Sequence, residues 1–211
     1  MENKTDKKKK NKIDKRTPLR NKTFIFEFFI IINLFLQIIS PFITSKNSII
    51  TLKIQGKGQK TIFGSFFESY PNEIKINGDS KYPGQTSYNF ELEDNTVELI
   101  WDNNNPLYTC KNMFNGCRDI TEIDLSYFDT SQVIDMHKMF YTCTSLNSLK
   151  LDNFDTSKVT DMSYMFASCS SLSTLNLSEF DTSQVEDMCY MFFSCSSLLS
   201  LNLSNFNTLK L

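Results

Sequence analysis

Hydrophobic residues in the second half of the chain recur with a fixed period of 26 residues. Each of four copies contains a Met-Phe pair, a cysteine, a leucine and a phenylalanine at corresponding positions. A fixed period in this range is typical of a solenoid, whose units bury their apolar faces against one another. The in-phase residues are Met113, Met139, Met165 and Met191, each followed by Phe; Cys117, Cys143, Cys169 and Cys195; Leu125, Leu151, Leu177 and Leu203; and Phe128, Phe154, Phe180 and Phe206.

Two shorter patterns share each repeat. The apolar residues of 159–166 fall at i, i+3, i+6 and i+7, which predicts one face of a short helix. Leu175 and Leu177 then alternate with polar residues, which predicts a half-buried strand. The motif Phe-Asp-Thr-Ser follows as a return loop at 128–131, 154–157 and 180–183. The sequence therefore predicts an α/β repeat, with one short helix and one short strand in each 26-residue unit.

The repeat resembles a known family in the string Val-x-Asp-Met-x-x-Met-Phe-x-x-Cys-x-x-Leu-x-x-Leu-x-Leu-x-x-Phe-Asp-Thr-Ser. This string resembles the BspA-like leucine-rich repeat surface proteins of microbes, in their 26-residue variant, over residues 106–211. The resemblance implies a leucine-rich-repeat solenoid displayed on a cell surface, with a role in adhesion or recognition. The ligands of that family are diverse, so the resemblance implies no particular partner.

The segment before the repeats has a different pattern. Residues 45–105 contain alternating apolar runs at 49–54, 74–76, 88–92 and 97–101, which predict strands. Asn77-Gly78-Asp79 and Pro83-Gly84 predict turns between them. A solenoid end exposes an apolar edge that needs a cover. We therefore expect a small β-rich cap module, with Trp101 packed at its junction with the first repeat.

The N-terminal segment predicts a membrane location. Residues 1–22 carry ten Lys and Arg against three Asp and Glu, which predicts a basic cytoplasmic tail. Residues 23–44 are apolar and about long enough to cross a bilayer as a helix. The positive-inside rule then places residues 45–211 outside the cell, behind a signal-anchor. A cleaved signal peptide, which would give a secreted protein, and a buried core helix are the alternatives.

The remaining candidate chemistry is sparse. The in-phase cysteines predict a ladder of buried thiols, with disulfides between them as the alternative, whereas Cys189 is predicted to be exposed. Asp129 and its equivalents Asp155 and Asp181 favour capping of backbone amides over calcium binding. The chain has one histidine and neither a phosphate loop nor a catalytic motif. We expect no enzyme, cofactor or metal, and the net charge of −9 over residues 23–211 excludes a nucleic-acid binder.

The polar residues that alternate with the strand leucines predict one open surface, which is the candidate ligand face. We expect a protein or glycan ligand there; the alternative function is structural, with lateral self-association through an uncapped C-terminal edge. Asn176 and Asn202 also begin N-glycosylation sequons, although Asn-x-Ser can simply repeat with the unit. The face comprises Glu122, Asp124, Ser126, Ser148, Lys150, Asp152, Thr174, Asn176, Ser178, Ser200, Asn202 and Ser204.

Overall fold

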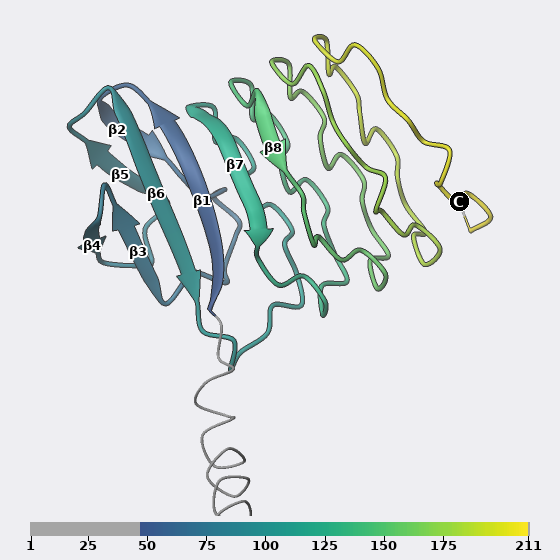
Figure 1. The fold of residues 1–211 in the computed structure, drawn as a ribbon, viewed down its shortest axis with the longest axis horizontal. Helices are drawn as coiled ribbons and strands as arrows, with labels where there is room; N and C mark the ends of the chain where they lie inside the picture. The colour runs from purple at the N-terminus through teal and green to yellow at the C-terminus, as the bar shows by residue number, and fades with distance from the viewer. Residues whose placement is uncertain (1–46, 211) are drawn as a thin grey trace, which may run out of the picture. The chain divides into compact units, whose positions relative to one another are not determined.

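A computed structural model describes residues 47–210 of the chain. A six-stranded sheet has the order β4-β3-β6-β1-β7-β8, and β2 pairs with β5 in a separate two-stranded sheet (Figure 1). Neighbouring strands of the large sheet are antiparallel except for β7 and β8, which are parallel. The strands are β1 (Ser48–Gln55), β2 (Gly58–Thr61), β3 (Glu73–Ile76), β4 (Asp79–Lys81), β5 (Ser87–Phe90), β6 (Asp94–Trp101), β7 (Ile120–Tyr127) and β8 (Ser148–Lys150).

The segments with alternating apolar residues form the centre of the large sheet. In β1, Ile50, Leu52 and Ile54 are buried, while Lys53 and Gln55 are exposed. The predicted runs at 74–76, 88–92 and 97–101 become β3, β5 and β6, because each places its apolar residues on one buried face. The short strands β2 and β4 contain mainly polar or small residues, so alternation did not reveal them.

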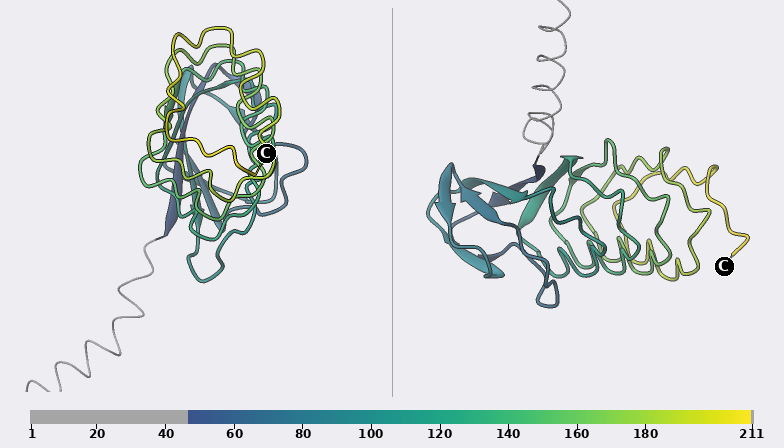
Figure 2. Two further views of the ribbon diagram at one scale, coloured as in Figure 1. Left: turned by 90° about the vertical axis from the view of Figure 1, so that its right-hand side faces the viewer. Right: turned by 90° about the horizontal axis from the view of Figure 1, so that it is seen from below.

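The repeats form four stacked coils of one period each: residues 107–132, 133–158, 159–184 and 185–210. The view along the stack shows the coils superimposed as closed loops (Figure 2). Each coil has a strand side, which includes β7 in coil 1 and β8 in coil 2, and an opposite side made of tight turns. We call the second the turn side; it comprises residues 109–117, 135–143, 161–169 and 187–195.

Backbone hydrogen bonds join the coils on the turn side in four continuous columns. Every second amide donates to the carbonyl 25 residues later, in the next coil, with N···O distances of 2.7–3.0 Å. Each column thus continues through one peptide group per coil, and such chains of bonds polarise one another. The donors are Cys110, Asn112, Phe114 and Gly116 in coil 1, Met136, Lys138, Phe140 and Thr142 in coil 2, and Met162, Tyr164, Phe166 and Ser168 in coil 3.

The predicted helix in each repeat, and with it the α/β fold class, is wrong. No helix occurs in residues 47–210, which form strands and stacked turns. Lys138 and Tyr164 have φ = 57°, whereas an α-helix needs φ near −63°. Local turns such as Met165 N–H to Met162 O, at 3.2 Å, place side chains three residues apart on one side, as a helix does. The apolar spacing therefore fits both structures.

The membrane prediction is also corrected. Over the range that the structure covers, no helix has the length and apolar character needed to cross a membrane. The apolar segment 23–44 lies outside that range, as do the basic residues 1–22. We therefore do not carry the transmembrane helix or the membrane localisation further.

A column of phenylalanine rings runs through the core of the coils. Phe114, Phe140, Phe166 and Phe192 stack on one another with ring centroids 5.4–5.9 Å apart. Phe63, which belongs to the module before the repeats, stacks on Phe114 at 6.4 Å. The module and the repeats therefore share one hydrophobic core.

Trp101 lies at the junction of the module and the first coil, as predicted. Its ring meets Phe128 of coil 1 at 5.2 Å, and its indole N–H donates to Ser69 O at 2.9 Å. Because the aromatic packing and the polar N–H are both satisfied, the tryptophan is buried at little cost.

Candidate functional site

The predicted ligand face lies on the strand side of the coils. Asp124, Ser126 and Ser148 are half-buried, and the other nine predicted residues are exposed. The parallel pairing of Glu122 with Ser148 and of Asp124 with Lys150 brings coils 1 and 2 side by side on this face. Asn176 and Asn202 are both exposed, and each side-chain oxygen accepts the amide of the serine two residues later.

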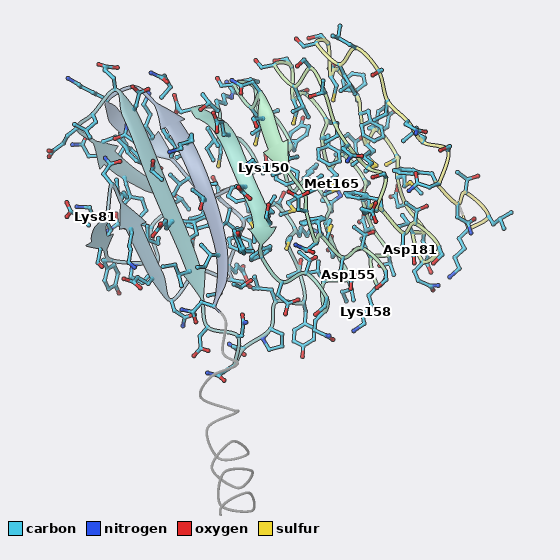
Figure 3. The ribbon with its side chains drawn as sticks, viewed as in Figure 1. Lys81, Lys150, Asp155, Lys158, Met165 and Asp181 are labelled. Carbon is cyan, nitrogen blue, oxygen red and sulfur yellow. The ribbon has the colours of Figure 1, made fainter. Side chains whose placement is uncertain are left out.

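A hollow of about 710 Å³ opens on this face between coils 2 and 3. Its floor is apolar and includes Leu149, Leu151, Phe154 and Phe180. Figure 3 shows Lys150 beside β8, with Asp155 and Asp181 at corresponding corners of successive coils. We call this hollow the groove, and its polar lining is Lys150, Asp152, Asn153, Asp155, Asn176, Ser178 and Glu179.

Ion pairing within the face leaves the groove with an excess of negative charge. The Lys150 ammonium donates to Asp124 Oδ2 at 2.9 Å, and this bond raises the pKa of Lys150. Partial burial opposes ionisation of Asp124, but bonds from Ser126 and Lys150 outweigh it and lower the pKa of the carboxyl group. Lys150 is therefore engaged, while the lining carries the carboxylates of Asp152, Asp155 and Glu179. The groove suits a ligand that donates hydrogen bonds.

The cysteine ladder is a structural feature of the coil interior. Cys117, Cys143 and Cys169 are buried and Cys195 is half-buried. Each later thiol donates to a carbonyl of the preceding coil, as Cys143 does to Phe114 O at 3.1 Å. Burial raises the pKa of Cys169 to about 12, so the thiol stays protonated at neutral pH. Cys189, in contrast, is exposed on the turn side.

The repeated aspartates cap backbone amides. Asp129, Asp155 and Asp181 each accept the amide of the serine two residues later, at 2.9 Å. A second series on the turn side does the same: Asp161 Oδ1 accepts Ser163 N–H at 2.8 Å, as its equivalents in the other coils do. Within residues 47–210, no group of three or more His, Cys, Asp or Glu side chains could hold a metal ion.

An aromatic ridge on the turn side was missed by the sequence reasoning. Tyr164 and Tyr190 stack with ring centroids 5.0 Å apart, and Phe193 meets Tyr190 edge-on at 5.7 Å. The Lys138 ammonium lies 5.2 Å from the Tyr164 ring centroid. The signal was present, because 138, 164 and 190 are in phase, but the helix prediction treated these residues only as a polar face. An exposed aromatic ridge favours contact with another molecule.

Comparison with known proteins adds a family of unstated role. Residues 108–211 match the model of a family described as a Mycoplasma protein of unknown function, DUF285. No curated protein and no solved structure has a significant match to the chain.

The family match corrects the resemblance drawn from the repeat string. The matched model is that of DUF285 and not of a leucine-rich-repeat family. The coils also lack the helix that the resemblance implied. The assignment to BspA-like leucine-rich repeat surface proteins is therefore withdrawn, and the coils are described by their own geometry.

Proposed function

We propose that the repeat region is a non-enzymatic recognition module that binds a polar ligand in the groove on its strand side. The observation that supports this is the position of the groove, which lies among residues of the predicted ligand face. Lys150, Asp152, Asn176 and Ser178 belong to both. A concave surface with an apolar floor and a few polar groups has the features of a binding site.

The charges of the groove define the ligand chemistry. Carboxylate oxygens accept hydrogen bonds only, and the amides of Asn153 and Asn176 can both accept and donate. A Lys or Arg side chain of a protein or the hydroxyl groups of a neutral glycan match this lining. An anionic polymer would meet three carboxylates, and the one lysine is already held by Asp124.

The test uses one charge reversal inside the groove and a matched one outside. Glu179 lines the groove, whereas Glu186 is exposed on another part of the coil surface. The full chain is applied to an array of Lys- and Arg-containing peptides, neutral glycans and sulfated glycans. We expect binding to peptides or neutral glycans, at least ~10-fold weaker in Glu179→Lys and unchanged in Glu186→Lys.

The array distinguishes the two ligand classes and can refute the proposal. Preferential binding to basic peptides identifies a protein ligand, and preferential binding to neutral glycans identifies a carbohydrate ligand. Binding only to sulfated glycans, or equal loss in both variants, would contradict recognition through this groove. Equal melting temperatures of the two variants are required before the comparison is made.

A further inference from the structure

The last coil ends the four hydrogen-bond columns with unpaired donors. In coils 1 to 3 the corresponding amides all donate to the next coil. Within residues 47–210, the amides of Met188, Tyr190, Phe192 and Ser194 have no hydrogen-bond acceptor. Their peptide carbonyls point the other way, since Asp187 O and Met191 O accept amides of coil 3. The outer edge of coil 4 therefore presents a row of four aligned N–H groups.

The same edge exposes apolar surface that is buried in the earlier coils. Leu203 is 40% exposed, whereas its equivalent Leu177 is 2% exposed. Phe192 stacks on Phe166 at 5.8 Å but is only partly buried, because no further ring covers its outer face. Unpaired backbone donors and uncovered apolar side chains thus occur together, and both invite a partner.

We infer that this edge binds a further coil of the same repeat, carried by a separate polypeptide. The contact between successive coils already occurs three times in the structure, with the same four donors each time. A further coil would offer four carbonyl groups at two-residue spacing, matching the row of amides. Its Met-Phe pair would also cover Phe192, as Phe166 covers Phe140 at 5.4 Å. The inference does not depend on the proposed ligand groove.

One further group agrees with this occupant. Ile134 O and Thr160 O each accept an amide from the following coil, at 2.9 Å and 2.8 Å. Their equivalent Glu186 O has no such donor within residues 47–210. The edge therefore requires four acceptors and one donor from its partner, which is the complement that another coil provides.

A second copy of this chain fits the edge poorly. Two coil 4 edges facing each other would place N–H groups against N–H groups, which cannot pair. At the opposite end of the stack, the Gly64 amide already bonds to Met113 O at 2.9 Å in the middle of the carbonyl row. Lateral self-association through the coil 4 edge therefore lacks the complementary acceptors.

The probe is a labelled 26-residue peptide that copies coil 3, residues 159–184, added to the full chain. We expect saturable binding by fluorescence anisotropy. Amide exchange of Met188, Tyr190, Phe192 and Ser194 should slow on binding, while the amides of coils 1 to 3 should not change. A control peptide with aspartate in place of both residues of its Met-Phe pair should not bind, because it cannot cover Phe192.

Two neighbouring phenylalanines provide matched variants. Phe192→Asp should weaken peptide binding at least ~10-fold because its ring forms the contact, and Phe193→Asp should not, because its ring points to the ridge. Leu203→Asp gives an independent loss if Phe192→Asp lowers the melting temperature. The inference is overturned if the peptide does not bind, or if binding protects other amides. A concentration-dependent dimer that protects these four amides would overturn it too, by assigning the edge to a second copy.

Discussion

The amide of Gly64 donates a hydrogen bond of 2.9 Å to the carbonyl oxygen of Met113. Met113 O belongs to one of the four columns, because its peptide partner Phe114 donates to coil 2. Gly64 thus provides the column with a donor from outside the repeats. A side chain at this position would place Cβ 2.1 Å from Asn112 O, which is too close for any residue except glycine.

Gly64→Ala should therefore destabilise the protein by about 1–3 kcal/mol, because the added methyl group forces the module away from coil 1. Urea unfolding measures the loss, and amide exchange of coil 1 should become faster. Gly58→Ala is the control, since its Cβ meets nothing within 4 Å and only its φ of 89° is strained. Equal coil 1 exchange in the two variants would contradict this role of Gly64.

Removing a ring from the middle of the phenylalanine column should be costly. Phe166 is fully buried between Phe140 and Phe192, so Phe166→Ala should reduce the free energy of unfolding by about 3–5 kcal/mol. Phe193→Ala should cost less than about 1 kcal/mol, because that ring is 56% exposed. Chemical denaturation of both variants measures the difference. A loss below about 1 kcal/mol for Phe166→Ala would show that the column does not stabilise the stack.

The thiols should differ sharply in reactivity. Cys189 is exposed and should react first with a thiol reagent at pH 8, whereas Cys143 and Cys169 should react only after unfolding. Burial raises the pKa of Cys143 well above its usual value, so little thiolate is available there. Mass spectrometry after denaturation and alkylation should find Cys143 and Cys169 unpaired. A disulfide between them would contradict the buried ladder.

The single histidine should make stability depend on pH. Burial lowers the pKa of His137, although Asp161, with its Oδ2 3.7 Å from Nδ1, opposes this. Because the folded pKa lies below the unfolded value of 6.5, the stabilisation is present above 6.5 and is lost as pH falls through the folded pKa. Lys111, Lys138 and Asp135 are the other charges acting on the ring.

An NMR titration of the His137 ring measures this effect, and we expect a midpoint below 6.5. His137→Gln should remove the pH dependence of stability in this window. The carboxyl groups with lowered pKa, such as Asp181 and Asp187, act only below about 3.8, so they do not interfere. A midpoint above 6.5 would show that the carboxylate of Asp161 dominates over burial.

Much of the fold could be predicted because it depends on local alternation and on exact repetition. The apolar alternation of Ile50, Leu52 and Ile54 placed β1, since a strand with one buried face has a period of two. The period of 26 residues predicted a stack and its core positions, among them Met165 and Phe166, which are fully buried. Likewise, aspartate two residues before an amide predicted capping at Asp155.

The helices could not be excluded from the sequence, because the decisive bonds are not local. The amide of Tyr164 donates to Cys189 O in the next coil, and an apolar spacing of three or four residues does not show where an amide bonds. The groove on coils 2 and 3 and the aromatic ridge likewise exist only once the stack brings residues 26 apart together. The sequence by itself determined the repeat, its buried positions and the strands of the module. Only the tertiary structure decided that the backbone pairs between coils, because each coil satisfies its amides with its neighbour's carbonyls and not with its own.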